Sequence, residues 1–516
     1  MTNNSSSYRW WVMLVVIIGG FMSILDTSIV NIAMPKMMAV FGVGTDKAQW
    51  ILTVYMLTMG VLQPTTGYLC DVWGAKRMYI ASMVIFTIGS ALCGLAWSND
   101  SMIGFRIIQA VGGGVIIPVG MSIIYTIFPP EERNLAMGVW GISAMVAPAI
   151  GPTLSGYFVE YLDWRLIFTI NVPVGIVGTI LAAFILRESP VRKQAKFDMV
   201  GFLTSALGLF CLLLALSEVS DEGWTSIYIL SLLFVSFVSL LFFVIYELMH
   251  EDPLLDLTLF KNPTFSASTL VTFIGTVCLY GGIFLVPLFM ENLRNYSAMQ
   301  NGILLFPAAA MAGIMMPISG KIADRVGARP VVIVGLILLG LGNYGLRFLD
   351  LDTSYNYILW FLIIRSIGLG LFMMPVTVAG MNTVPFHKIA RASAMNNAVR
   401  QVSGSFGIAI LTTILQNRQV YHLNHMADYI NAASLGTQQI AGSLQNMFAL
   451  HGSTVLTAKT QALAVVSQLV QRQAYIFSFD DTFLVTALTC FLALIPALML
   501  KEKKRQPDAA PVHIAE

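Results

Sequence analysis

The chain has 516 residues, of which 57% are apolar and 11% are charged, and its formal net charge is +2. Soluble domains carry about 25% charged residues, and a mean hydropathy of +0.76 excludes a fold that must hide its apolar surface from water. The small net charge gives no basic field that would attract nucleic acid, so we expect no nucleic-acid partner.

Fourteen apolar stretches are long enough to cross a bilayer, which requires about 20 mostly apolar residues per helix. They are too long and too continuous for barrel strands, so the sequence predicts an all-α integral membrane protein in contact with the lipid bilayer. No small-residue cleavage site follows the first stretch, so we interpret it as a retained span. The predicted spans are 11–33, 48–69, 78–97, 102–125, 136–160, 166–186, 199–217, 225–246, 266–290, 301–320, 330–348, 357–380, 396–417 and 483–500.

The distribution of Lys and Arg predicts the orientation. With the N-terminus inside, the cytoplasmic segments hold eighteen of these residues and the outer segments hold eight. Cytoplasmic loops carry the excess of Lys and Arg in membrane proteins. We therefore expect a multi-pass protein of the cell (inner) membrane with both termini in the cytoplasm, which requires an even number of spans.

The first span contains Asp26, the only acid well inside a span in the first half of the chain. A charge inside a membrane is expensive and usually functional. Desolvation disfavours the charged form of a carboxyl, so Asp26 could load and lose a proton. The alternative is an acid near the outer interface that Thr27 or Asn31 caps.

The loop after the second span carries a Gly-Asp-Gly-basic motif that returns 253 residues later, after the tenth span. The glycines allow tight turns, and the charges, together with helix ends, could form a cluster that latches one conformation. One copy would indicate only a solvated turn, but two copies at matching offsets favour the latch. The latch residues are Gly67, Asp71, Gly74, Lys76 and Arg77 in the first copy and Gly320, Asp324, Gly327 and Arg329 in the second.

A second repeated pattern places an arginine ahead of a glycine run. Arg106 precedes Gly112 in the fourth span, and Arg365 precedes Gly368 in the twelfth, with the two arginines 259 residues apart. A buried arginine needs a partner, usually a carboxylate. The alternative is an arginine that packs and snorkels to the interface.

These repeats divide the chain into related halves. We expect an N-terminal six-helix half at 1–190, a two-helix insertion with its flanking loops at 191–260, and a C-terminal six-helix half at 261–505. The tail at 506–516 is predicted to be disordered. Repeated halves are a transporter architecture, with the substrate path between them.

Further stretches carry a family resemblance. The fifth span holds prolines and glycines that can bend a helix and let a neighbour approach closely. With Leu25 to Pro35, the stretch 163–175, the stretch 391–401 and both loop motifs, the chain resembles the major facilitator superfamily. The finer similarity is to the fourteen-span drug:proton antiporters of the EmrB/QacA type. The residues similar to the antiporter motif of these exporters are Pro148, Gly151, Pro152 and Gly156.

The resemblance implies a fold of two six-helix halves plus two inserted helices. It implies that Asp26 couples transport to protons and attracts cationic drugs, and that Arg106 takes part in proton transfer. It also implies that the antiporter motif shapes the interface between the halves and limits leak.

The segment 418–482, between the last two spans, is long, polar and Gln-rich, so we expect amphipathic helices there on the outer side. This segment is a candidate docking site for a periplasmic adaptor protein if the cell has two membranes. His422 and His425 have a spacing that could suit a metal, but we interpret them as exposed polar residues and predict no metal site.

Enzyme signatures are missing from the sequence, including a phosphate-binding Gly-x-x-x-x-Gly-Lys-Ser/Thr loop. We therefore predict a transporter that is not an enzyme and has no cofactor, driven by an ion gradient or by the solute itself, and the resemblance implies the proton gradient. The favoured function is proton-coupled export of lipophilic, often cationic small molecules by alternating access. The alternatives are a dedicated exporter of one antibiotic or metabolite, and a membrane sensor or structural subunit without transport, which retention of Asp26 and Arg106 disfavours.

Overall fold

A computed structural model describes residues 6–189, 191, 197–250, 253–429, 435–451 and 453–501. Every regular element in these ranges is a helix. The tail at 506–516, predicted to be disordered, lies outside the described residues. Helices are the expected solution, because a chain in lipid must satisfy its backbone hydrogen bonds within each segment.

The prediction of fourteen membrane-spanning helices is confirmed. In the described ranges, thirteen helical stretches are long and apolar enough to cross a membrane. The fourteenth crossing is made by two shorter helices in sequence, α3 (Trp50–Leu62) and α4 (Thr65–Trp73). They meet at Pro64, whose missing N–H removes one bond of the helical ladder.

The first bundle contains the crossings before residue 190. Its elements are α1 (Ser6–Phe41), α2 (Thr45–Ala48), α3, α4, α5 (Ala75–Gly94), α6 (Asn99–Ile127), α7 (Arg133–Tyr161), α8 (Leu166–Thr169) and α9 (Asn171–Ile185). Local signals set several ends: Ser98 and Ser101 form a capping box at the start of α6, and Gly74, with φ of 87°, ends α4.

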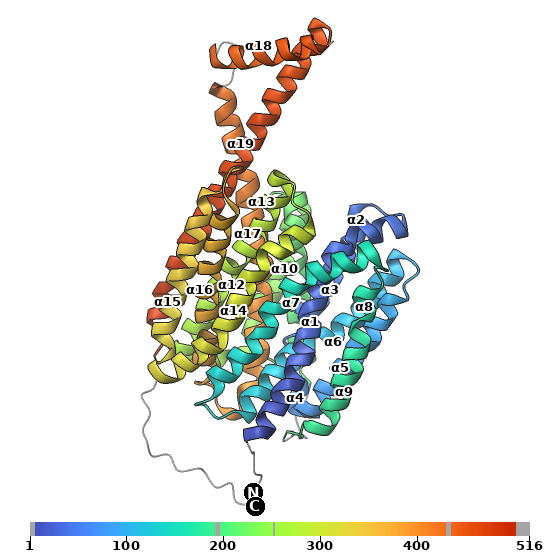
Figure 1. Cartoon of the computed structure of the whole chain (residues 1–516). Helices are drawn as coiled ribbons and strands as arrows, with labels where there is room; N and C mark the ends of the chain where they lie inside the picture. Colours follow the sequence, from blue (N-terminus) through green and yellow to red (C-terminus); the bar gives the residue numbers. More distant parts are fainter. Residues whose placement is uncertain are drawn as a thin grey trace, which may run out of the picture.

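The second bundle follows η1 (Leu257–Lys261), a short 3₁₀ helix. Its elements are α12 (Pro263–Ile283), α13 (Leu285–Arg294), α14 (Ala298–Val326), α15 (Ala328–Gly345), η2 (Leu346–Phe348), α16 (Tyr355–Met381), η3 (Phe386–Lys388), α17 (Ile389–Tyr429), α18 (Leu435–Leu450), α19 (Val455–Leu492) and α20 (Leu494–Leu498). Figure 1 shows the two bundles side by side, with α7 and α14 in the middle.

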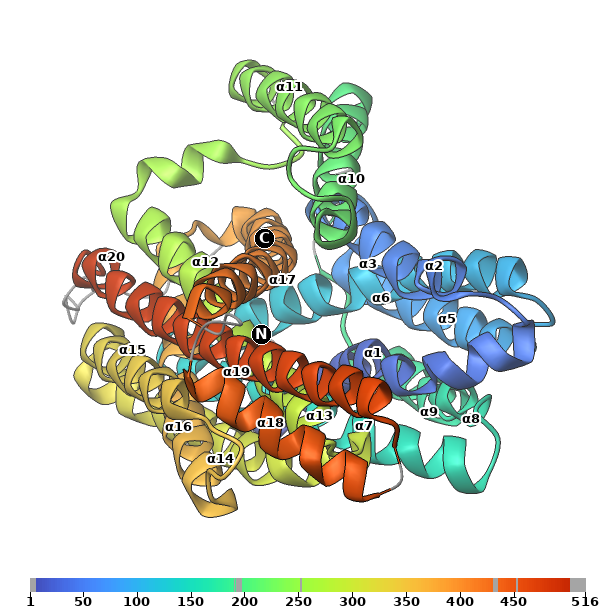
Figure 2. The same ribbon diagram turned by 90° about the horizontal axis from the view of Figure 1, so that it is seen from above.

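Two helices stand at the side of the bundles, α10 (Met199–Glu222) and α11 (Ile227–Met249) (Figure 2). Helix α10 packs against α3 of the first bundle and α17 of the second. Helix α11 lies outermost and exposes Phe234 and Phe237 at 69% and 66%. An apolar face of this kind is what a lipid-facing helix requires.

The segment 418–482 is mostly helical in its described part, because α17 and α19 both extend far beyond the apolar stretches that marked their spans. Their extensions project from the bundles, and α18 lies across the tip (Figure 1). We call α18 and these extensions the projection. His422 Nε2 lies 2.6 Å from Asp481 Oδ2 in it, and no group of three potential metal ligands occurs among the described residues.

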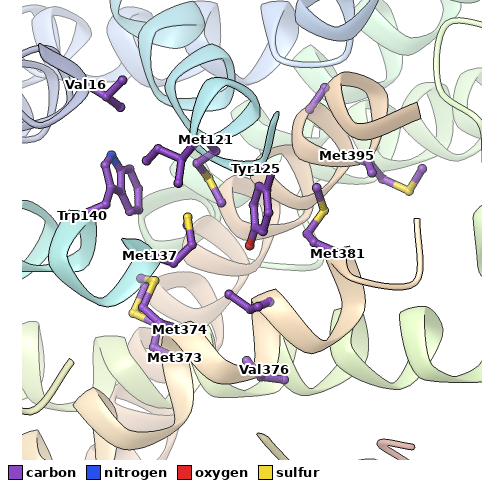
Figure 3. Close-up of a cluster of buried hydrophobic side chains, with 14 of the residues drawn as sticks. Val16, Met121, Tyr125, Met137, Trp140, Met373, Met374, Val376, Met381 and Met395 are labelled. Atoms are coloured by element: carbon purple, nitrogen blue, oxygen red, sulfur yellow. The ribbon is translucent and has the colours of Figure 1, made fainter. Parts of the chain in front are cut away.

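The two ends of the molecule are named here by their contents. The motif end contains the start of α1 and the turns at Gly74 and Gly327, and the α18 end carries the projection (Figure 1). Toward the motif end, a cluster of buried side chains, rich in methionine, joins the bundles. Figure 3 shows this methionine cluster: Val16, Met121, Tyr125, Met137 and Trp140 come from the first bundle, and Met373, Met374, Val376, Met381 and Met395 come from the second.

Candidate functional site

The structure brings Asp26 and Arg106 into direct contact inside the first bundle. Asp26 lies on α1 and is 0% exposed, and Arg106 lies on α6 and is 1% exposed. Arg106 Nη1 donates to Asp26 Oδ2 at 2.5 Å. Both residues are therefore deep in the protein, and each supplies the opposite charge that the other requires. Neither alternative interpretation, an interfacial acid or a snorkelling arginine, fits this burial.

Three further polar side chains complete the hydrogen bonding of the pair. Gln109 Nε2 donates to Asp26 Oδ1 at 2.7 Å and its Oε1 accepts from Arg106 Nη1 at 2.7 Å. Asn171 Nδ2, from α9, donates to Asp26 Oδ1 at 3.3 Å, and both amides donate to Ser90 Oγ. Both carboxylate oxygens of Asp26 are thus hydrogen-bonded.

Helix α3 covers the remaining side of Arg106. The guanidinium carbon lies 3.9 Å from the centre of the Tyr55 ring, a cation–π contact, and Nε donates to the Ile51 carbonyl at 3.3 Å. The glycine run of α6 makes room for this arrangement, because a Cβ on Gly113 would lie 2.6 Å from Tyr55 Oη. Five crossings of the first bundle therefore hold one charged pair.

Sequence reasoning did not assign Gln109, Asn171 or Ser90 to this site. Gln109 follows Arg106 by three residues, so the two lie on one helix face, and that spacing could have identified it. Asn171 and Ser90 come from other crossings, and only the fold brings them to Asp26.

The first loop motif joins the two bundles at the motif end. Asp71 Oδ2, on α4, accepts from Arg391 Nε on α17 at 3.1 Å. Gly67 makes the approach possible, because a Cβ there would lie 2.7 Å from the Arg391 Cα. Gly67 and Asp71 therefore contact the opposite half of the molecule.

The basic residues of this motif have a different role from the predicted charge cluster with Asp71. Arg77 Nε lies 3.3 Å from Glu188 Oε2, just beyond α9, and Lys76 Nζ donates to the Ala183 carbonyl at 2.7 Å. They fasten α5 to α9 within the first bundle. The carboxylate end of Glu188 fits here because Gly74 has no side chain.

The second loop motif makes the reciprocal contact. Asp324 Oδ1, on α14, accepts from Asn134 Nδ2 on α7 at 2.7 Å. Gly320 lies directly against the Asn134 backbone, as Gly67 lies against Arg391. Gly327 ends α14 with φ of 97°, and Arg329 is exposed. Each motif therefore binds the opposite half, which the sequence could not show.

Two further hydrogen bonds join the halves at the motif end. Arg133 Nη1 donates to Asn382 Oδ1 at 2.9 Å, and Ser393 Oγ donates to the Pro118 carbonyl at 2.9 Å. Together with the methionine cluster, these contacts close the motif end in this conformation.

The antiporter motif lies on α7, which continues through Pro148 and Pro152. A Cβ on Gly151 would overlap Ser28 of α1, so this glycine allows close packing, as predicted. Gly156 is different, because a Cβ there would meet nothing within 4 Å. The expectation that Gly156 serves close helix approach is therefore wrong.

The alignment of Arg365 with Arg106 also requires correction. Gly112 packs against Ser82 and Phe86 of α5, and Gly368 packs in the same way against Gly335 and Leu339 of α15. These two glycines are 256 residues apart, whereas the alignment of Arg365 with Arg106 assumed an offset of 259 residues. Three residues before each glycine stand Gln109 and Arg365, so Arg365 takes the place of Gln109 in the second half.

Comparison with known proteins finds relatives over nearly the whole chain. The family model described as Major Facilitator Superfamily matches residues 16–408. The MFS-type transporter YhcA of Bacillus subtilis is 37% identical over 494 residues, which cover 96% of this chain and 93% of that protein. The multidrug export protein EmrB of Haemophilus influenzae is 30% identical over 480 residues, 92% of each chain. The solved structure of the proton:xylose symporter XylE matches with a TM-score of 0.60 at 12% identity, over 94% of this chain and 96% of that one, and so shares the fold.

Proposed function

Because the chain belongs to the major facilitator superfamily and is a membrane transporter, not an enzyme, we propose that it is a drug:proton antiporter. It exports lipophilic and often cationic compounds by alternating access. The proton gradient supplies the energy, and no cofactor takes part.

The observation that carries this proposal is the buried Asp26–Arg106 pair. A proton on Asp26 would cancel the negative charge that compensates a guanidinium only 1% exposed. A buried charge without its partner is strongly destabilising. Protonation of Asp26 must therefore be accompanied by rearrangement around Arg106, and this links the proton to the conformation of the first bundle.

In the proposed cycle, substrate binds while Asp26 is charged and the site faces the cytoplasm. The halves then rock, and protonation of Asp26 from the outer side weakens substrate binding and releases it. The bias of Lys and Arg supports a cytoplasmic motif end and cytoplasmic termini, in the inner membrane. In that orientation, the present conformation is closed toward the cytoplasm.

The projection is the proposed docking site for an adaptor protein, if the cell has an outer membrane. It carries exposed apolar side chains, among them Leu450 at 87% and Leu456 at 74%. Exposed apolar side chains on a part of the chain that leaves the bundles are consistent with a protein partner.

The test is drug efflux in proteoliposomes under an imposed pH gradient. Asp26→Asn keeps the size of the side chain and removes its charge. We expect gradient-driven transport to fall to the level of empty liposomes, while Asp46→Asn, at an exposed acid on α2, leaves it unchanged. Wild-type rates for Asp26→Asn would refute the proton-coupling proposal.

A dedicated exporter of one antibiotic or metabolite would use the same machinery. A panel of compounds in a host without its own pumps separates the two functions. Resistance to many lipophilic cations supports the multidrug proposal, and resistance to one compound supports the dedicated exporter.

A further inference from the structure

A small, partly open cavity of about 80 Å³ lies between the two halves, where α7 meets α12, α14 and α16. One charged side chain lines it, Arg365, which is 3% exposed. The other lining residues are apolar apart from Ser366, and they include Met145, Pro148 and Leu305. A space of this size holds a few waters or one polar headgroup, since a single water needs roughly 10–15 Å³.

Arg365 is held firmly but without a counter-charge. Its Nε donates to Asn343 Oδ1 at 3.1 Å, and its Nη2 donates to the carbonyls of Cys278 and Leu279. None of the salt bridges found in the described ranges includes Arg365, and Nη1 has no hydrogen bond there. Gly282, which also lines the cavity, leaves room for the guanidinium, because a Cβ there would lie 2.5 Å from Nη1.

The internal repeat shows that this site occupies the position in the second half that the Asp26 site occupies in the first. Leu279 lies 253 residues after Asp26, and Asn343 lies 253 residues after Ser90. Arg365 donates to the Leu279 backbone carbonyl and to Asn343 Oδ1, at the positions where Gln109 donates to the Asp26 carboxylate and to Ser90 Oγ. The first half therefore holds the compensated Asp26–Arg106 pair at this place, whereas Arg365 in the second half has no carboxylate partner among the described residues.

The repeat also accounts for the empty space. The residue 253 positions after Tyr55 is Ala308, which lines the cavity. In the first half, the Tyr55 ring covers Arg106, which the corrected alignment does not pair with Arg365. In the second half, Ala308 stands at the position of Tyr55 and contributes only a methyl group to the lining of the cavity.

We propose that Arg365 is an anion subsite of the transport pathway, and that it binds the carboxylate of a lipophilic monoanion or zwitterion. The inference rests on the proposed function, because it assigns a substrate class to the same pathway. A buried unpaired charge is costly, and a carboxylate at Nη1 supplies the missing charge by a charge-assisted hydrogen bond. The cavity holds only the headgroup, so the apolar tail lies between the halves.

The test is equilibrium binding of radiolabelled decanoate to the purified protein in neutral detergent, without a proton gradient. We expect unlabelled decanoate and decanesulfonate to compete and decanol to compete poorly. Arg365→Gln should weaken decanoate binding by about tenfold or more, as loss of a hydrogen bond between charged groups predicts. Arg365→Lys should retain most of the affinity, and Arg325→Gln, at an exposed arginine, should match wild type.

A second variant tests the cavity itself. Ala308→Tyr introduces the residue that the first half carries and keeps the charge of Arg365. We expect it to weaken decanoate binding while decyltrimethylammonium binding stays unchanged. Equal loss of anion and cation binding in both variants would overturn the proposal, as would equal competition by decanol and decanoate on the wild-type protein.

A membrane phospholipid offers the same anionic chemistry, so phosphatidylglycerol and phosphatidylcholine are added as competitors. Displacement of decanoate by phosphatidylglycerol at low lipid ratios would assign the site to a lipid headgroup and overturn the substrate assignment. Arg365→Gln leaves Asp26 in place, so its efflux of decyltrimethylammonium in proteoliposomes should still depend on the imposed pH gradient. Failure of proton coupling and failure of the anion subsite are therefore distinguishable.

Discussion

Asp71 on α4 and Arg391 on α17 are 320 residues apart in the chain, and they form an ion pair of 3.1 Å across the two halves of the molecule. Asn134 and Asp324 make the matching contact from the other loop motif. The repeated motif is therefore a pair of reciprocal latches, each reaching from one half to the other at the motif end.

Removing both latches should open the motif end. We expect the double variant Asp71→Asn, Asp324→Asn to populate longer distances between spin labels at Ser7 and Phe386, one on each half. The five native cysteines are buried, so engineered cysteines can be labelled selectively. The Asp71–Arg391 side chains are only 12% and 6% exposed, so losing this pair costs more than the ~1 kcal/mol of a surface pair, and we expect at least a several-fold population shift. An unchanged distance distribution would show that other contacts hold this end closed.

The glycines of the latches should tolerate no side chain. Gly320→Ala would press its Cβ against the Asn134 backbone, so we expect slower efflux and a more open motif end. Gly156→Ala is the matched control, because its Cβ would enter open space and alanine favours a helix by up to about 1 kcal/mol. Initial efflux rates of the two variants check this. An equal loss of efflux rate in Gly320→Ala and Gly156→Ala would refute the packing argument.

The Asp26–Arg106 pair should show strong coupling in stability. Either Asp26→Asn or Arg106→Gln alone leaves a buried charge uncompensated, a cost of about 3–5 kcal/mol. The double variant removes both charges and should recover a large part of that loss. Thermal unfolding of the four proteins in detergent measures the coupling. Additive losses would mean that the two charges do not interact.

The Asp256–Lys388 contact beside η1 gives a pH-dependent prediction outside the membrane. Burial of Asp256 disfavours its charge, but hydrogen bonds from Lys388 and Thr258 outweigh burial, so the pKa of Asp256 lies below its ordinary value. Its contribution to stability is then complete above the unfolded pKa of about 3.9 and disappears as the pH falls through the folded pKa.

Asp256→Asn should therefore lower the unfolding midpoint by about 1–2 °C, by the same amount at every pH from about 5 to 8. Scanning calorimetry or intrinsic fluorescence over that range checks it. The pH profile of efflux should keep its wild-type shape in this variant. If the difference in unfolding midpoint between Asp256→Asn and wild type changes over this pH range, another group titrates there.

The sequence predicted the membrane fold well because hydrophobic length is a local property. It predicted helices within 418–482 but not that α17 and α19 run from the membrane into this segment without a break, because apolar stretches mark only the part in lipid, while Gln- and Ala-rich segments continue the helices through Tyr429 and from Val455. The high cost of burying an unpaired charge also indicated that Arg106 requires a carboxylate. Which polar residues join it depends on packing between crossings, and this is why Gln109 and Asn171 were missed.

Two errors at the sites have a common physical cause. The glycine runs allowed an alignment of Arg365 that is off by about one helical turn, and only the contacts of Gly112 and Gly368 with their neighbours fixed the register. Gly156 was assigned to close packing for the same reason: a glycine in a sequence shows that a close contact is permitted, not that one exists.

The methionine cluster makes closure of the motif end sensitive to oxidants. Peroxide converts a thioether into a sulfoxide, which is polar and chiral. Met137 and Met374 are fully buried in the interface between the halves. A sulfoxide at either residue would place a strong dipole in this apolar interface, where it has no water to solvate it. Oxidative stress would then slow turnover of the pump without modifying the residues proposed to bind protons or substrate. Methionine sulfoxide reductases would restore the turnover rate.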